Sequence, residues 1–262
     1  MSSENDENDQ YFYVSRNSFS KTSKNLMLTK FQYNPTAFEQ LNHFDVAKSL
    51  LETNSHHIDE LGDVICQYGL EDVVGLCLLH KHFELNPDEC MVKEMAQSAA
   101  YIRPFSINYV QSLIPCAWRL GFNTESGQCV VYPLEFVPYS EKAELAYNLA
   151  HSINNASGFL LDFSRKLEEM GLTDVFGIFS LHSDIEINDN EILLETTNLR
   201  NRILSLVVTS KDEVDWKEIT ETTWKFTAIK EELDELDPLG ICIAHCRRHC
   251  GSHCRGHCPI PC

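Results

Sequence analysis

Cysteine and histidine recur with a fixed spacing at the C-terminal end of the chain. From residue 242 a cysteine occupies every fourth position, and four of these cysteines directly follow a histidine. The repeat consists of Cys242, His245, Cys246, His249, Cys250, His253, Cys254, His257, Cys258 and Cys262. Thiolates and neutral imidazoles are zinc ligands, and thiolates also bind Cu(I) well. The repeat therefore predicts a metal-binding tail over residues 241–262, with zinc or Cu(I) as its cofactor.

The number of ligands and the residues between them indicate how such a tail would bind metal. A tetrahedral zinc ion takes four ligands, so the repeat suffices for about two ions. Gly251, Gly256, Pro259 and Pro261 oppose a continuous helix. We therefore expect a Cys/His-rich tail that is disordered when empty and folds around its metal. The spacing is not that of a standard zinc finger, because it contains no C-x2-C pair.

Other chemistries fit the same cysteines. They could carry acyl chains and anchor the protein to a membrane, or form disulfides in an oxidising compartment. They could also be the modified residues of a genetically encoded peptide, with the rest of the chain as its leader or scaffold. The opening MSSENDENDQ lacks the basic and apolar parts of a secretory signal. No apolar run approaches the roughly 20 residues of a transmembrane segment. We therefore expect a cytoplasmic protein with reduced thiols, which favours metal over disulfides.

A second candidate metal site lies in the first half of the chain. His80 and His82 are two residues apart in a stretch with the alternation of a strand, and Glu84 follows on the same face. Two histidines and a carboxylate can form a facial metal site. His182 ends another predicted strand and could complete the site if the two strands are neighbours. This pattern predicts a metal-dependent enzyme as the alternative function, although surface histidines on a half-exposed strand are the simpler interpretation.

Few other residues point to chemistry. A catalytic cysteine paired with a histidine, for instance Cys90 or Cys116 with His82, is possible in principle, but nothing in the sequence selects a pair. The polar stretch 195–200 follows a predicted strand and could line a pocket. The chain contains no phosphate-binding loop, dinucleotide-binding, serine-hydrolase or kinase signature.

The helices and strands that the sequence predicts, and that must position these residues, fit one α+β domain over residues 31–228. A chain of 262 residues with 43% hydrophobic residues can bury a substantial core. Apolar periodicity predicts helices over 37–52 and 58–68, and a longer helical stretch over 140–171 that breaks near 154–158. Short apolar runs predict strands over 73–79 and 80–85, a hairpin over 114–132, and strands over 175–181, 191–196, 203–209 and 222–227. This order favours a largely antiparallel sheet with flanking helices.

The composition of the chain distinguishes its two ends from the body, and its net charge restricts the partners that the protein can bind. Residues 1–30 are expected to be flexible, although Tyr11, Phe12 and Tyr13 could dock on the body, and residues 229–240 form an acidic tether. The net charge is −18, and the tail holds three arginines and no acid, so the remainder carries −21. Such an acidic body argues against nucleic acid as a partner. Our leading prediction is a non-enzymatic protein whose tail captures zinc or Cu(I), while the body recognises a protein partner or delivers the metal.

Overall fold

The computed structural model describes residues 13–14, 33–96, 99–108, 113–138, 143–156, 158–181, 185, 187–229 and 245–255, with 13–14, 143–145 and 245–255 described as backbone alone. Its helices are α1 (Pro35–Glu39), α2 (Phe44–Asn54), α3 (Ile58–Gln67), α4 (Ala143–Asn155) and α5 (Phe159–Met170), with short 3-10 turns η1 (Ser55–His57) and η3 (Lys211–Glu213). Its strands are β1 (Tyr13–Val14), β2 (Val74–Leu78), β3 (Glu89–Met95), β4 (Ala99–Ser106), β5 (Leu113–Asn123), β6 (Gln128–Pro138), β7 (Phe176–Ser180), β8 (Glu191–Asn198), β9 (Ile203–Ser210), β10 (Ile219–Ile229) and β11 (His245–Arg255).

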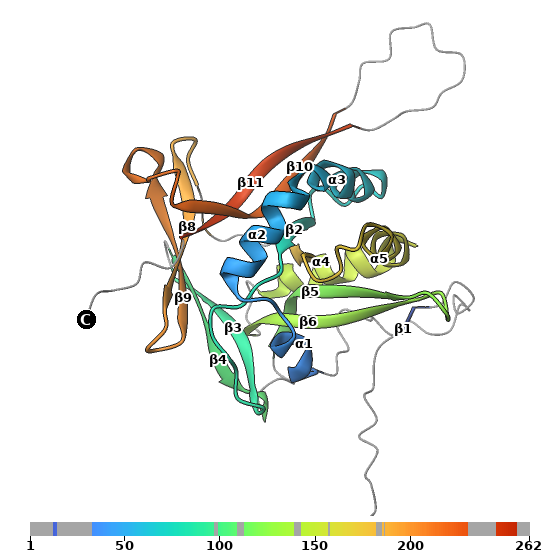
Figure 1. Ribbon diagram of the computed structural model, residues 1–262, viewed down its shortest axis with the longest axis horizontal. Coiled ribbons are helices and arrows are strands. Elements are labelled where there is room, and N and C mark those ends of the chain that lie inside the picture. The colour runs from blue at the N-terminus through green and yellow to red at the C-terminus, as the bar shows by residue number, and fades with distance from the viewer. Residues whose placement is uncertain are drawn as a thin grey trace, which may run out of the picture.

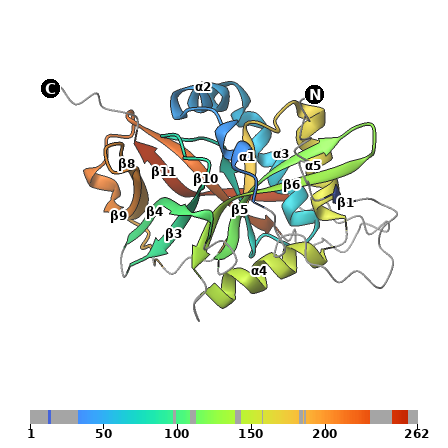
Figure 2. The ribbon, with the colours of Figure 1, turned by 90° about the horizontal axis from the view of Figure 1, so that it is seen from below.

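The strands form one curled mixed sheet with helices packed on it (Figures 1 and 2). Their order is β1-β6-β3-β4-β9-β8-β11-β10-β2-β7-β5, and β6 also pairs with β5. The order of strands therefore returns to β6, and the sheet curls into a ring. The pairings β3–β6 and β8–β11 are parallel, whereas the other pairings among the described strands are antiparallel. The architecture is α+β.

Two main clusters of buried side chains lie on the two faces of this curled sheet. The first joins the apolar faces of α2, α3 and α5 to Trp118, Phe176 and Trp224 on the strands. In α3, Ile58, Leu61 and Ile65 recur every three or four residues, and all are completely or almost completely buried. The second cluster joins α1 to the side chains that β3, β4, β6, β8 and β9 direct into the ring. Helices α2, α3 and α5 therefore cover the outside, whereas α1 contributes to the separate lining of the inside.

The predicted helix over 37–52 is interrupted in the structure. α1 ends at Glu39, and α2 begins at Phe44 after a turn in which His43 forms a parallel bridge with Lys81. The amide of Lys81 donates to the carbonyl of Asn42, and the amide of Phe44 donates to the carbonyl of Lys81. These tertiary hydrogen bonds replace the bonds of a continuous helix. The same contacts make 80–85 an irregular segment with one bridge residue, where the sequence predicts a strand.

The tail also differs from its prediction in part. The Cys/His repeat is expected to be disordered, yet the backbone of His245–Arg255 forms β11 between β8 and β10. β11 runs antiparallel to β10 from Ile219↔Arg255 to Ile229↔His245, with two register shifts. The cysteines are four residues apart, and this even spacing is compatible with the two-residue period of a strand. β10 offers unpaired backbone groups along its edge, with which such a strand can pair. The remaining tail residues and the predicted acidic tether after Ile229 lie outside the described residues.

The N-terminal segment enters the described structure at one place. Tyr13 and Val14 form β1, which pairs with Val130 and Cys129 of β6. This pairing agrees with the expectation that the aromatic stretch around Tyr13 docks on the body. The rest of 1–30 lies outside the described residues. No helix in the described part of the chain has the length and apolar character needed to cross a membrane.

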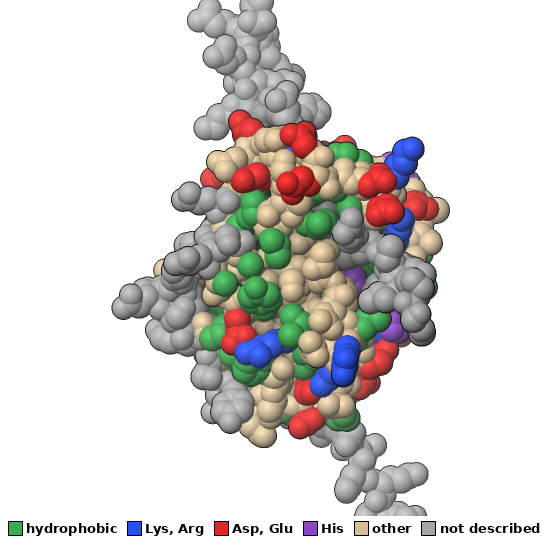
Figure 3. Space-filling model, turned by 90° about the vertical axis from the view of Figure 1, so that its left-hand side faces the viewer, with side chains coloured by type: hydrophobic (Ala, Val, Ile, Leu, Met, Phe, Trp, Pro, Cys, Tyr) green, Lys and Arg blue, Asp and Glu red, His purple; other side chains and the backbone are tan. Residues whose placement is uncertain are grey.

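The surface reflects the acidic composition. On the face drawn in Figure 3, acidic side chains occupy the upper and lower parts, and hydrophobic side chains lie between them. Tyr101 and Val207 are among the exposed large hydrophobic residues of the chain, and they belong to the paired strands β4 and β9. Most of the large apolar side chains are nevertheless buried in the two clusters.

A glycine of β7 allows three strands to meet beside the ring interior. A Cβ atom added to Gly177 would lie 2.5 Å from the carbonyl oxygen of Trp118 and 2.6 Å from a methyl group of Leu79. The Gly177→Ala variant is expected to lose about 1–3 kcal/mol of unfolding free energy, because backbone must move to relieve the contact. Gly121→Ala is the matched control, since its Cβ would meet nothing closer than 3.7 Å. Urea unfolding of both variants measures the difference, and an equal loss in the two would contradict this explanation.

Candidate metal centre

Two histidines and one glutamate converge in the ring interior. His82 Nε2 lies 2.9 Å from Glu195 Oε1, and His80 Nε2 lies 3.6 Å from the same oxygen. One ligand atom from each of the three residues falls within 4.8 Å of the others. Two imidazoles and one carboxylate form the ligand set of many catalytic zinc sites and of non-haem Fe(II) sites. Among the described residues, this group can hold a metal ion.

Contacts around the two imidazole rings fix their orientation. His80 Nδ1 lies 2.9 Å from the carbonyl oxygen of Leu78. When a metal ion is bound, the proton on Nδ1 would be donated to this carbonyl and the lone pair of Nε2 would be left for the ion, which is the arrangement typical of a metal-binding histidine. The ring of Phe44 stacks on His82 and meets His80 edge-on, with both centroids 5.3 Å away. The carbonyl of Leu78 in β2 therefore suits the tautomer that a metal-bound His80 would need.

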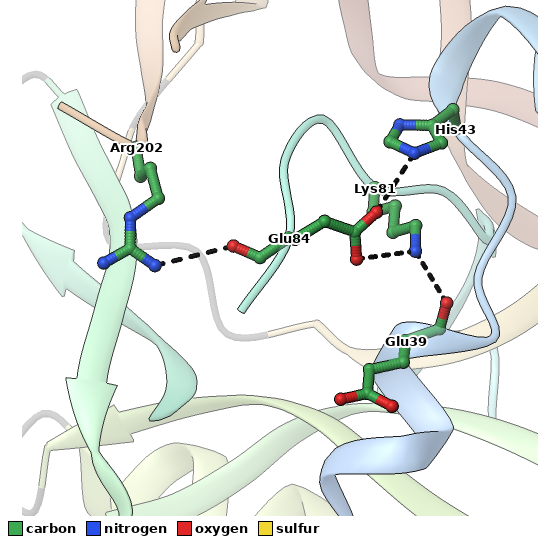
Figure 4. Close-up of polar contacts among 5 residues, drawn as sticks. All are labelled: Glu39, His43, Lys81, Glu84 and Arg202. Atoms are coloured by element: carbon green, nitrogen blue, oxygen red, sulfur yellow. Dashed lines mark hydrogen bonds and ion pairs between the residues drawn. The ribbon is translucent and has the colours of Figure 1, made fainter. Parts of the chain in front are cut away.

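A polar network holds the irregular segment that carries both histidines (Figure 4). Lys81 is buried, and its Nζ donates to Glu84 Oε2 at 2.9 Å and to the carbonyl of Glu39 at 2.6 Å. Glu84 also lies 3.1 Å from His43 Nε2. Because Lys81 stands between the two histidines in the chain, anchoring it to α1 and to the start of α2 positions the rings on either side.

Burial and charge act together on this group. Glu195 and His82 are buried, and His80 is nearly so. Burial by itself would raise the pKa of Glu195, but the hydrogen bonds and charges of His80 and His82 hold this pKa far below its usual value. Burial would likewise lower the pKa of His80, yet Glu195 more than offsets this and raises it. The carboxylate therefore stays ionised between the two rings and provides the negative charge that a cation requires.

The structure selects some of the residues proposed from the sequence and not others. It brings His80 and His82 together as expected. It does not add Glu84, whose half-exposed carboxylate turns away to Lys81 and His43. The strand alternation that placed Glu84 beside the histidines does not apply, because 80–85 is irregular. His182 and the side chains of the tail ligands lie outside the described residues.

Sequence reasoning identified Glu195 only as the start of a polar stretch that could line a pocket. In β8 it shares a face with Leu193, two residues earlier, and both side chains are buried in the ring. A carboxylate that continues the buried face of an apolar strand is a detectable signal, because such a group must be paired. Its partner His82 is 113 residues away along the chain, and His80 lies farther still, so only the sheet topology identifies them.

A cavity of about 150 Å³ adjoins the three residues. It also contains Glu135, Lys93 and the thiols of Cys77 and Cys116. Burial raises the pKa of both thiols, with the nearby charge of Glu135 acting in the same direction. Protonated, buried thiols are poor nucleophiles, so this environment opposes the idea of Cys116 as a catalytic cysteine.

The remaining body cysteines differ in their state. Cys90 and Cys129 are free thiols, like Cys77 and Cys116. Cys66 of α3 is disulfide-bonded, and its partner lies outside the side chains that the structure describes.

An ion pair at the edge of the site should contribute to stability in a pH-dependent way. Arg202 binds both carboxylate oxygens of Glu89, at 2.5 and 2.8 Å, and reaches the carbonyl of Glu84. Arg202 lowers the pKa of Glu89 below 4.5, so the pair stabilises the fold above that pH and loses its effect as the pH falls through the lower folded value.

Replacing Arg202 by Gln is therefore expected to cost about 1 kcal/mol of unfolding free energy at pH 7, a figure reduced for the partial exposure of Arg202. The cost should shrink below pH 4.5 as Glu89 becomes protonated. Urea unfolding of Arg202→Gln and Arg200→Gln across this range measures the effect, since Arg200 makes no ion pair among the described side chains. A cost that does not change with pH would contradict the assignment.

Taken together, the fold and this site define a curled mixed-sheet α+β protein with a buried His/His/Glu group beside an internal cavity. No protein family model, no curated protein and no solved structure matches the chain.

Proposed function

We propose that this protein binds transition-metal ions at two places, the Cys/His repeat of its tail and the His80/His82/Glu195 group of its body. The convergence of three ligand atoms within 4.8 Å in a buried setting supports the body site. A buried carboxylate between two imidazoles favours a divalent ion, and zinc suits this ligand set. The thiolates of the repeat would capture zinc or Cu(I) and concentrate it near the body.

The path of the tail supports a delivery role. β11 lies next to β8, and in their parallel register the Cα atom of Cys254 pairs with that of Glu195. The repeat thus passes beside the strand that supplies the carboxylate of the body site. A metal ion released by tail thiolates would have only a short distance to travel to His80, His82 and Glu195. The tail is then the loading segment, and the body is the destination.

A metal-dependent enzyme is the second candidate function. The cavity beside the metal group favours it, because three protein ligands leave coordination positions open to a molecule bound there. A pure storage protein has no need for such a space. The enzyme hypothesis keeps the two histidines proposed from the sequence and replaces Glu84 by Glu195 as the carboxylate ligand.

Zinc stoichiometry tests the body site directly. In the full-length chain with all six tail cysteines replaced by serine, equilibrium dialysis is expected to leave one zinc ion per chain. Adding His80→Ala and His82→Ala to the same chain should remove that ion. The difference between the two chains isolates the body, because both contain the same tail. A full complement of zinc in the chain without the two histidines would exclude the site.

A further inference from the structure

The walls of the internal cavity are mostly apolar, and its polar groups gather beside the metal group. Side chains of Phe38, Leu41, Met91, Ile102 and Leu134 line it, together with others from β8 and β9. The polar lining includes the metal group, Glu135, Lys93 and the hydroxyl residues Ser180, Thr222 and Thr223. Few well-placed polar groups in an apolar cavity are typical of small-molecule sites.

The volume of the cavity limits the size of its ligand. An apolar protein cavity of about 150 Å³ accepts benzene, and this cavity has about the same volume. The apolar part of a ligand therefore corresponds to a single six-membered ring or a short branched chain. A long fatty acyl chain would not fit without displacing side chains.

The charges around the cavity favour an anion. Lys81 lines the cavity, but its positive charge is neutralised by the ion pair with Glu84. The other charged groups of the lining then cancel. Lys93 and Lys225 carry two positive charges, and Glu135 and Glu195 carry at most two negative charges. A bound divalent metal ion would leave two uncompensated positive charges in a largely buried space, where unpaired charge is costly. A negatively charged ligand would reduce that excess.

We propose that the cavity binds a small carboxylate with a compact apolar body, of the size of benzoate, whose carboxylate coordinates the metal ion held by His80, His82 and Glu195. This inference rests on the proposed body site, since the metal supplies the charge that selects the anion. The ring of the ligand packs against Ile102, Leu134 and the other apolar walls. Three protein ligands leave the metal open to the carboxylate.

Calorimetric titration of benzoate into the zinc-loaded, full-length protein tests the proposal. Benzoate is expected to bind at least about tenfold more tightly than benzamide, which has the same shape without the charge. Metal-free protein should bind benzoate at least about tenfold more weakly than zinc-loaded protein. Ile102→Phe places a larger side chain in the wall and should abolish benzoate binding without changing the zinc content.

The outcomes separate this inference from the proposed function. Zinc bound at the body site together with no benzoate binding overturns the inference and leaves the proposed function intact. Equal binding of benzoate and benzamide excludes the anionic head, and unchanged binding by Ile102→Phe places the ligand elsewhere. Should Ile102→Phe fail to fold, Lys93→Met serves instead, and it should weaken benzoate by removing a positive charge from the wall. Full zinc occupancy in Glu195→Gln would contradict the body site itself.

Discussion

The Glu195→Gln variant is expected to bind zinc at the body site at least about 100-fold more weakly than the native chain. Loss of a residue that only orients a ligand costs 10–100-fold in metal affinity, and Glu195 is itself proposed as a ligand. It supplies the one carboxylate of the group and lies within 3.6 Å of both histidine Nε2 atoms. Glutamine keeps the shape and removes the charge that the cation requires.

Glu84→Gln is the matched control, because Glu84 belongs to the same segment as the histidines but points to Lys81 and His43. Its zinc affinity should stay within about threefold of the native value, because glutamine retains an oxygen that can accept a hydrogen bond from Lys81, which the carbonyl of Glu39 also holds in place. Competition with a chromophoric chelator, in chains with the six tail cysteines replaced by serine, measures both affinities. Equal effects of the two variants would contradict the assignment of Glu195.

Thermal unfolding provides a second measurement. A ligand at 100 times its Kd stabilises the native state by about 2.7 kcal/mol, so zinc should raise the Tm of the native chain. The same zinc concentration should leave the Tm of Glu195→Gln nearly unchanged when both Tm values are measured in chains with the six tail cysteines replaced by serine. A variant that retains its metal-free Tm but loses the zinc response has lost the site and not the fold.

The elements that periodicity identifies well are those whose contacts are local. The apolar spacing in α3, and that in α5 with Gly171 after its last residue, predicts both helices. The strands β7, β8 and β9 likewise follow apolar runs of about the expected length, and β10 extends beyond the predicted 222–227. In each case buried side chains recur over part or all of the element, so the pattern in the sequence is largely regular.

The errors occur where a distant contact determines the local conformation. The bridge between His43 and Lys81 interrupts the first helix and prevents a regular strand over 80–85. No local pattern carries this information, because both segments have residues compatible with regular structure. The sequence therefore suggested His80 and His82, which do lie together, through a strand alternation that is not present.

A distant contact also explains why the sequence suggested Glu84 as the carboxylate of the group, whereas the structure places Glu195 there. Glu84 is close in sequence, and a strand would place it beside His82. The sheet order instead brings β8 across the ring to the end of β2, so that Glu195 takes the position. Pairing of strands far apart in the chain is the information that a single sequence does not contain.

Removing the tail is expected to change both metal capacity and stability. A chain that ends at Leu239 lacks the whole repeat, so under reducing, anaerobic conditions it should bind about two fewer zinc ions than the full chain. It also lacks β11, which pairs with β10 along most of its length and with β8 at two positions. We expect a loss of about 1–3 kcal/mol of unfolding free energy, because the net gain from the lost hydrogen bonds is largely offset by chain entropy.

Replacing the six tail cysteines by serine separates these two effects. This full-length variant keeps the backbone of β11 but not its thiolates, so its metal capacity should fall like that of the shortened chain. Its unfolding free energy should stay closer to the native value under reducing conditions, which open the Cys66 disulfide in all three chains. Metal analysis and urea unfolding of the three chains test both parts. Equal metal content in the native and shortened chains would refute metal capture by the tail. Equal unfolding free energies in those two chains would show that β11 does not stabilise the sheet, and the delivery path beside Glu195 would lose its support.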